Sequence, residues 1–292
     1  MKRSLLAVVC LGVVLGSARG QTAEQKAQTV HFLRSLQQAD GGFPNAPASQ
    51  TPSSLRATSA ALRALKYWGG EPKDLPAAAK FIARCYDQSS GGFADQPGGK
   101  PDVFSTAVGL MAVVEAKLPL AAYSDGAVKY LAENAKTFEE VRIAVAGLEA
   151  IGTLSPRLKE WRQQVAGLLN PDGTAGKGEG AARETGSVIV ALLRMGAAVE
   201  NKDQVLKVLR AGQRADGGFG KADAKGSDLE TSYRVMRAFH MLKSKPDSPE
   251  RLREFVAKCR NADGGYGVAP GQPSLVAGTY YAGIIGHWLD QK

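Results

Sequence analysis

The sequence predicts an all-α protein, a closed ring of six helical hairpins whose second helices lie on the inside. Three observations predict it. A short phrase returns along the chain, as QQADGGF at 37–43, QSSGGF at 88–93, QRADGGFG at 213–220 and RNADGGYG at 260–267. Each copy is followed by a helix-like segment rich in small residues, and residues 21–292 contain no alternating pattern typical of strands. Repetition at a steady period indicates a repeat architecture.

The spacing of the phrase gives the number of repeats. One residue in each recognisable copy serves as a reference: Asp40, Ser90, Asp172, Asp216 and Asp263. Successive reference residues are 50, 82, 44 and 47 residues apart. Because the long step is about two ordinary ones, a degenerate repeat is expected between Ser90 and Asp172, in KYLAENAKTFEEVRIAVAGLEAIG at 129–152. The six repeats then run at about 24–70, 71–120, 121–154, 155–199, 200–246 and 247–292.

The first twenty residues have the pattern of an export signal. Lys2 and Arg3 precede an apolar run from Leu5 to Leu15, and small residues lead up to Gly20. The apolar run is too short to span a bilayer, so we expect cleavage near Gly20 and no stable membrane span afterwards. The sequence therefore predicts an exported protein, periplasmic or secreted, with residues 21–292 as one domain.

Charge excludes one class of partner. The formal charge is +9 at pH 7, and removing the signal with its three basic residues leaves +6. The remaining Lys and Arg are scattered and form no basic or basic-aromatic block, so we do not expect nucleic acid binding. Cys85 and Cys259 stand at the ends of first-half helices in repeats that are not neighbours in a six-membered ring. We therefore favour two buried free thiols over a disulfide.

Each repeat divides into an outer and an inner helix. In the first half, for example VHFLRSLQQ at 30–38, the apolar residues recur at helical spacing. This helix ends at Asp-Gly-Gly, where glycine supplies the positive φ that stops a helix, and the next aromatic folds back as a pin. The second half is rich in Ala, Gly, Thr and Leu and suits burial on nearly all sides. It begins at a good N-cap residue, one of Ser54, Asp102, Asp228 and Ser274.

No polar capping repeat is evident at either end of the array. An open solenoid needs such caps to cover its terminal repeats, whereas a ring has no exposed end. The sequence therefore favours closure.

At this point the residues resemble a known family. Gln followed by Asp-Gly-Gly-Phe and a small-residue helix, about every 45 residues, resembles the prenyltransferase and squalene-oxidase repeat. The β subunits of protein prenyltransferases and the squalene–hopene-type cyclases share that repeat. FLRSLQQADGGF at 32–43 and VLRAGQRADGGF at 208–219 are similar to the cyclases' QW motif, with Phe43 and Phe219 in place of Trp. The resemblance covers residues 24–290 and implies an (α/α)6 toroid of twelve helices, with the inner helices around a central cavity.

The zinc site of the prenyltransferases appears in this sequence only in part. Family β subunits hold zinc through an Asp and a Cys at the start of one inner helix and a His at the start of the next. Lys225 and Asp228 match the family's Lys-x-x-Asp, and Tyr233 matches the Tyr after the metal Cys. Two residues are inserted relative to the family spacing, so either Asp228 or Glu230 can take the Asp place. Ser232 stands at the Cys position, and the His position falls at Val276 or Ala277. We therefore expect no zinc or other cofactor, and no α-subunit partner.

The cyclase alternative needs an acid held protonated. The resemblance places the cyclases' Asp-x-Asp-Asp run at Asp228-Leu229-Glu230-Thr231, where Thr replaces the third acid. Glu184 and Glu230 each precede a Thr at the start of neighbouring inner helices, so in a ring they face the same mouth. The candidate catalytic residues are thus Asp228, Glu230 and Glu184. The alternative is structural, with Asp228 as an N-cap and the two glutamates as first-turn acids favoured by the helix dipole.

Two functional hypotheses follow. The first is an exported toroid without zinc chemistry that binds an apolar isoprenoid-like lipid or a peptide in its cavity. The second is an enzyme that handles prenyl diphosphates, with Lys225 and Tyr233 on the diphosphate, or an acid-initiated cyclase or isomerase that uses Asp228 and Glu230. The candidate ligand-binding residues are Lys225, Tyr233, Tyr280, Tyr281 and Asp102.

Overall fold

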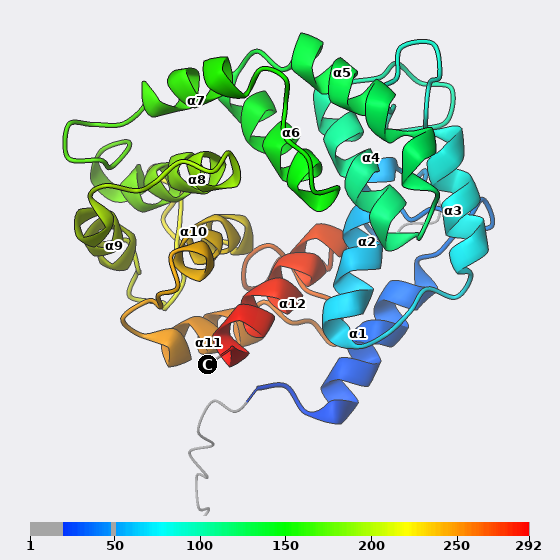
Figure 1. Cartoon of the computed structure of the whole chain (residues 1–292). Coiled ribbons are helices and arrows are strands. Elements are labelled where there is room, and N and C mark those ends of the chain that lie inside the picture. The colour runs from blue at the N-terminus through cyan, green and yellow to red at the C-terminus, as the bar shows by residue number, and fades with distance from the viewer. Residues whose placement is uncertain (1–19, 48–50, 292) are drawn as a thin grey trace, which may run out of the picture.

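The computed structural model describes residues 20–47 and 51–291, and the predicted signal segment 1–19 lies outside them. These residues form twelve α-helices in two alternating layers (Figure 1). The outer helices are α1 (Ala23–Ser35), α3 (Leu75–Arg84), α5 (Ser124–Asn134), α7 (Leu158–Ala166), α9 (Lys202–Ala211) and α11 (Pro249–Lys258). The inner helices are α2 (Leu55–Trp68), α4 (Val103–Glu115), α6 (Phe138–Ala150), α8 (Ala181–Arg194), α10 (Leu229–Met241) and α12 (Val276–Asp290). Two short 3-10 helices are η1 (Leu120–Ala122) and η2 (Gly178–Gly180).

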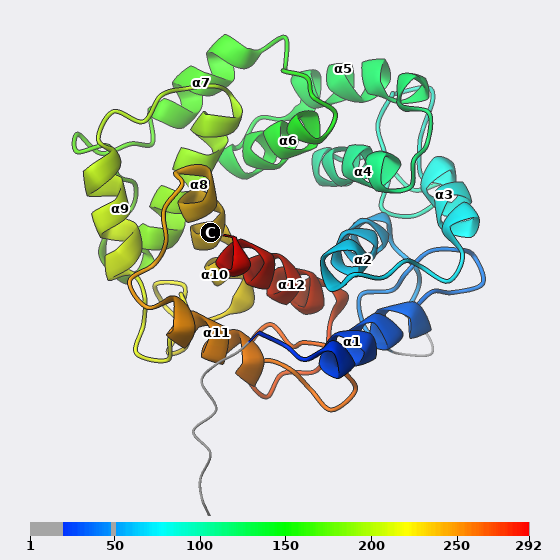
Figure 2. The ribbon, with the colours of Figure 1, turned by 60° about the horizontal axis from the view of Figure 1, so that its bottom comes forward.

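The six inner helices form a closed ring, and the outer helices surround it (Figure 2). Closure occurs where α12 packs against α2. The Trp68 indole donates a hydrogen bond to the Thr279 carbonyl at 3.0 Å, and Gly283 lies so close to Trp68 that an added Cβ would approach its ring within 2.9 Å. The all-α ring of six hairpins is therefore confirmed. In the described ranges the extended pairing is limited to isolated bridges, and no helix is long and apolar enough to cross a membrane.

The two layers bury their helices to different extents. The outer helix α9 buries one face, with Val205, Leu206 and Leu209. The inner helix α4 buries nine of its thirteen residues, because Ala, Gly, Ser and Thr let neighbouring helices approach from several sides. The sequence pattern assigned each helix to its layer correctly.

Three of the four expected N-caps form as predicted. Ser54, Asp102 and Asp228 each accept a hydrogen bond from the backbone N–H three residues later. Ser274 was wrongly expected to cap the last inner helix, whose N-cap is Leu275. The Ser274 hydroxyl instead donates to the Asp263 carboxylate of the repeated phrase at 2.8 Å, so it fastens the loop to the hinge.

The glycines of the repeated phrase join one repeat to the next. The first glycine of each pair has a positive φ and packs against the next outer helix: a Cβ on Gly41 would lie 2.1 Å from the Ala77 carbonyl oxygen of α3. Gly264 makes the same approach to Gln28 of α1 and so closes the outer ring. The Gly-Gly phrase is thus an inter-repeat contact as well as a hinge.

A buried hydroxyl on the inner helix fixes the hinge in five of the six repeats. It accepts a hydrogen bond from the N–H of the residue that follows the Gly-Gly pair, or of the equivalent residue Ala175 in the fourth repeat. The accepting residues are Thr58, Thr106, Thr185, Ser232 and Thr279, at 2.9 to 3.1 Å. Without this acceptor a buried N–H would be unpaired, which is costly.

The degenerate third repeat also forms its hairpin. Thr137 and Glu140 make a capping box at the start of α6, only a few residues after α5 ends. Cys85 and Cys259 are buried and free, as favoured from the sequence. Burial raises the pKa of each thiol to about 12, so both are inert neutral groups at pH 7.

Candidate functional site

The ring encloses a cavity of about 680 Å³, lined by side chains from all six inner helices. This volume is typical of a site for a small organic ligand. The cavity lies in the centre of the toroid, between α4 and α6 on one side and α10, α12 and α2 on the other (Figure 2).

The two sides of the cavity differ in chemistry. The wall formed by α4 and α6 is mainly apolar and comprises Phe104, Val108, Met111, Val114, Ile143, Ala146 and Ala150. Seven basic side chains also line the cavity: Arg56, Arg63, Lys66, Arg142, Arg194, Arg234 and Arg237. Only four acidic residues accompany them, Asp95, Glu115, Glu149 and Glu230, which leaves a formal charge of +3. Such a cavity suits a ligand with an apolar part and a negative charge.

Tyrosines from α10 and α12 form the aromatic part of the basic side. Tyr233 and Tyr281 have ring centroids 5.0 Å apart, and Tyr233 and Tyr280 have centroids 5.8 Å apart. Trp288 stacks on Tyr233 at 5.8 Å with an interplanar angle of 18°. The structure therefore brings the three predicted tyrosines together in the cavity wall.

Two arginines are held against these rings. The Arg63 guanidinium lies 4.4 Å from the Tyr280 ring centroid and donates to its hydroxyl at 3.0 Å. The Arg237 guanidinium lies 4.7 Å from the Trp288 centroid and donates to the Tyr233 hydroxyl at 3.5 Å. Stacking on aromatic faces fixes the orientation of both cations.

The Tyr233 phenol has a perturbed pKa. Burial by itself raises it, but the guanidiniums of Arg237, Arg194 and Arg63 lower the pKa of Tyr233 to about 7. The neighbouring Tyr280 and Tyr281 have raised pKa values because they are buried. Tyr233 is thus the cavity tyrosine that changes charge near neutral pH.

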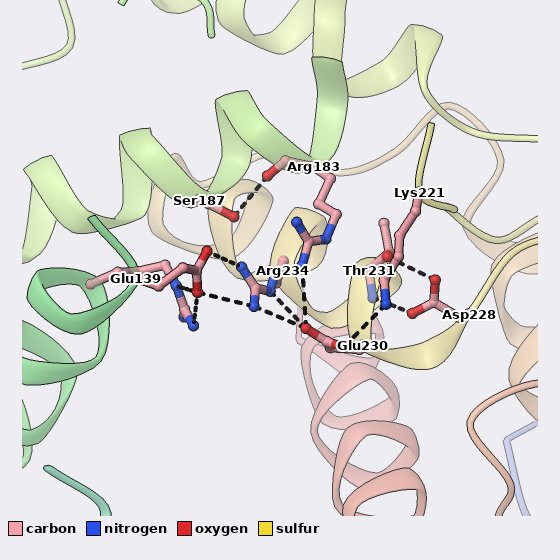
Figure 3. Close-up of polar contacts among 9 residues, drawn as sticks. Glu139, Arg183, Ser187, Lys221, Asp228, Glu230, Thr231 and Arg234 are labelled. Carbon is pink, nitrogen blue, oxygen red and sulfur yellow. Dashed lines mark hydrogen bonds and ion pairs between the residues drawn. The ribbon is translucent and has the colours of Figure 1, made fainter. Parts of the chain in front are cut away.

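A network of ion pairs spans the cavity edge from α6 to α10 (Figure 3). Arg234 of α10 binds the Glu139 carboxylate of α6 at 2.9 Å and the Glu230 carboxylate of its own helix at 2.9 Å. Arg142 binds the other oxygen of Glu139 at 2.8 Å. This network ties two inner helices that are separated in the ring by α8.

We expect Glu139→Gln to lower the free energy of unfolding by about 1 kcal/mol at pH 7. Burial by itself raises the pKa of Glu139, but Arg234 and Arg142 lower it to about 2. Ionised Glu139 therefore stabilises the fold above its ordinary pKa of 4.5, and this contribution is lost as the pH falls from there towards 2. The effect is small because 42% of the Glu139 side chain is exposed and solvent screens its ion pairs.

Urea denaturation at pH 7 and at pH 3 measures this effect. The difference between wild type and Glu139→Gln should shrink at pH 3. Glu254→Gln, a substitution of an exposed carboxylate on α11, should change stability by less than about 0.5 kcal/mol. If Glu139→Gln behaves like this control, the network contributes nothing to the fold.

The acidic residues predicted for catalysis take separate positions. Glu230 lines the cavity. Burial by itself raises its pKa, but Arg234, Lys221 and Arg183 cause a net lowering. Asp228 caps α10, and its two oxygens accept hydrogen bonds from the Thr231 N–H and hydroxyl.

Glu184 is exposed and is not part of the cavity lining. Its carboxylate packs against Gly176, since a Cβ added there would lie 2.1 Å from its Oε2. The predicted pairing of Glu184 with Glu230 at one mouth does not appear in the cavity lining, because this side chain turns towards its own loop.

The remaining predicted ligand residues lie off the cavity lining. Lys225 is exposed in the loop before α10. Asp102 caps α4 and forms an ion pair with Arg56 at 2.9 Å, so it acts on the cavity only through that arginine.

The positions compared with the zinc ligands do not fit a metal. Ser232 is fully buried and points to the hinge, where its hydroxyl accepts from the Phe219 N–H at 3.0 Å. Helical periodicity places Glu230, Tyr233 and Arg237 on the cavity face of α10 and turns Ser232 away. Val276 and Ala277 offer no donor side chain. Within residues 20–47 and 51–291, no three His, Cys, Asp or Glu side chains gather as a metal site requires.

Sequence reasoning missed the arginines and Glu139. Arg63, Arg194 and Arg237 stand in inner helices, where the other residues are mostly small or apolar. A charged residue in a helix predicted to be internal must face a cavity or an oppositely charged partner. The positions of these three arginines in inner helices could therefore have identified them as cavity residues. Glu139 carries no comparable signal, because its partner Arg234 is 95 residues away.

The fold and the cavity together define the class of protein: an α/α toroid with an arginine-rich and aromatic central cavity. The chain belongs to the family described as the prenyltransferase alpha-alpha toroid domain, whose model matches residues 4–77, 71–142 and 122–288. No curated protein matches the chain in sequence.

Solved structures agree on the fold. A protein geranylgeranyltransferase-I of Candida albicans, complexed with GGPP, superposes with a TM-score of 0.66 at 14% identity, covering 79% of this chain and 82% of that one. A type II terpene cyclase of Scytonema, in complex with geranylgeranyl dihydroxybenzoate, gives 0.63 at 10% identity, covering 91% and 96%. A glycosidase gives 0.60 at 15% identity, covering 92% and 99%. At these identities the likeness shows the toroid fold alone.

Proposed function

We propose that this toroid is a binding protein whose central cavity holds an isoprenoid-like ligand without zinc chemistry. The observation that carries the proposal is the cavity of about 680 Å³, in which most of the lining residues from α4 and α6 are apolar and only Glu115, Arg142 and Glu149 are charged. Burying an apolar chain there gains roughly 0.8 kcal/mol for each methylene removed from water. Membership of the prenyltransferase toroid family supports the choice of an isoprenoid over other apolar chains.

The geometry favours binding over acid-initiated chemistry. Protonation of an alkene needs a carboxylic acid that is neutral at working pH. The pKa of Glu230 is lowered instead, and Asp228 is engaged as an N-cap. Zinc-dependent transfer lacks a thiolate and an imidazole at the compared positions, Ser232 and Val276 or Ala277. The site therefore supports neither acid-initiated nor zinc-dependent chemistry.

Binding of farnesol, a neutral isoprenoid, tests the proposal. Isothermal titration of residues 21–292 should show saturable binding at a stoichiometry of one. Ala146→Phe places a phenyl ring in the apolar wall and should weaken this binding by roughly tenfold or more.

The matched control is Ala27→Phe on the exposed side of the outer helix α1, which should bind like wild type. No binding of farnesol to wild type, or equal binding to both variants, would contradict the proposed function. Metal analysis of the protein purified from its own host checks the zinc-free part, since one equivalent of zinc would exclude it.

The site of action is part of the same proposal. The signal-like residues 1–20 support export with cleavage near Gly20. Cell fractionation with N-terminal sequencing tests this, and a protein that keeps residues 1–20 in the cytoplasm would rule it out.

A further inference from the structure

Two cations in the cavity form no ion pair with a carboxylate of the described residues. In the described part of the chain neither Arg63 nor Arg237 forms an ion pair, although Arg194 pairs with Glu149 at 2.8 Å and Arg234 pairs with Glu139 and Glu230. The Nε of Arg237 is moreover buried without any hydrogen-bond partner. Both guanidiniums donate to tyrosine hydroxyls, and the Arg63 Nε also donates to the Ser59 carbonyl at 3.2 Å, so their partners are neutral groups.

An unpaired guanidinium in such a place is costly. Taking a charge out of water carries a penalty of several kcal/mol, which an opposite charge must offset. Because Arg63 and Arg237 both line the ligand cavity, a ligand can supply the missing anion there. The two cations stand on α2 and α10, on either side of α12, and their rings Tyr280 and Tyr233 lie side by side at 5.8 Å.

We propose that Arg63 and Arg237, with the hydroxyls of Tyr233 and Tyr280, form an oxyanion site that binds a carboxylate or phosphate head of the cavity ligand. The inference rests on the proposed function for the ligand's apolar part and adds the chemistry of its head. Planar guanidiniums donate two parallel hydrogen bonds to either group, which a neutral alcohol cannot match.

The two sides of the cavity then have complementary roles. The head group lies at the side formed by α2, α10 and α12, and the apolar chain extends towards α4 and α6 (Figure 2). Tyr233 supports this assignment, because its lowered pKa reports a local excess of positive charge. The site therefore selects an acidic amphiphile, an isoprenoid acid or phosphate ester.

Calorimetric binding of three ten-carbon probes tests the site: geraniol, geranic acid and geranyl phosphate. At pH 6 wild type should bind at least one of the two anions roughly 30-fold more tightly than geraniol. Comparison of geranic acid with geranyl phosphate distinguishes the two head groups. Inorganic phosphate alone should bind weakly and compete with the preferred anion.

Arg63→Gln and Arg237→Gln should each remove most of this preference and leave geraniol binding within about twofold of wild type. Arg63→Lys keeps a charge and should retain part of the preference. The control is Arg210→Gln on the outer helix α9, where Arg210 pairs with Asp247. Circular dichroism identifies any variant that fails to fold, and Arg63→Gln then carries the test.

The outcomes separate the two proposals. If geraniol binds and both anions bind no more tightly, the oxyanion site is wrong and the apolar cavity stands. The site is equally excluded if both glutamine variants keep the wild-type preference. If none of the three probes binds, both proposals are overturned.

Discussion

Gly217→Ala is expected to lower the free energy of unfolding by more than about 3 kcal/mol, whereas Gly69→Ala should cost only about 1 kcal/mol. Both glycines have positive φ values, 94° and 77°. A Cβ at Gly217 would lie 2.1 Å from the Arg251 carbonyl oxygen on α11, while at Gly69 it would meet nothing within 4 Å.

The difference between the two variants isolates the contact between repeats. Strain from a positive φ is common to both, so the excess cost at Gly217 comes from the backbone of the next outer helix, which cannot move aside as a flexible side chain can. Urea denaturation followed by circular dichroism measures both values. Equal losses for the two variants would show that the Gly-Gly phrase is only a hinge and makes no close contact with the following repeat.

The affinity for an anionic ligand should fall by up to tenfold per pH unit as the pH rises from about 7 to 9, and Tyr233→Phe should abolish this dependence. Below pH 7 the Tyr233 phenol is neutral, and the neighbouring guanidiniums are free to bind the ligand's charge. Above pH 7 the phenolate forms and competes with the ligand for Arg237 and Arg63. Binding of the anion in turn raises the pKa of Tyr233.

The charged and titratable side chains near Tyr233 come from several helices. They are Arg63 and Tyr67 of α2, Arg194 of α8, Arg237 of α10, and Tyr280 and Tyr281 of α12. The arginines stay charged throughout this range, and the pKa values of these other tyrosines are raised. His240 stacks on Trp288 beside Tyr233, and burial and then Arg237 lower its pKa below the ordinary value of 6.5. Tyr233 is the tyrosine in this set whose pKa is lowered, so its ionisation is expected to govern the dependence.

Geranic acid is the suitable probe, because a carboxylate keeps a constant charge from pH 6 to 9. Calorimetry gives its affinity, and absorbance at 295 nm reports the phenolate directly. Tyr86→Phe, which removes a tyrosine outside the cavity lining, should leave the dependence unchanged. A pH-independent affinity in wild type, or an unchanged slope in Tyr233→Phe, would refute the linkage.

The repeat phrase was sufficient to predict the fold, because each copy encodes a local event. Asp-Gly-Gly stops the outer helix, the aromatic packs back, and Ser or Asp starts the inner helix in most repeats. The degenerate third repeat was recoverable from the distance between Ser90 and Asp172. Ser274 shows the limit of such local reading, since a competing bond to Asp263 displaces the expected cap.

The candidate site was predicted less completely. Tyr233, Tyr280, Tyr281 and Glu230 line the cavity as expected, because helical periodicity and ring closure place them there. Lys225 lies in an exposed loop, and Glu184 packs on Gly176, although both stand close in sequence to inner-helix starts.

The sequence by itself determined the number of hairpins, which helix of each pair is internal, and the closure of the ring. These properties follow from short-range patterns of burial and turn formation. The tertiary structure alone decided the chemistry of the cavity, because the charge state of a group depends on neighbours brought from other repeats. Arg63 and Arg237 are 174 positions apart in the chain, yet both act on Tyr233. Only the closed ring brings them together, and no carboxylate among the described residues forms an ion pair with either.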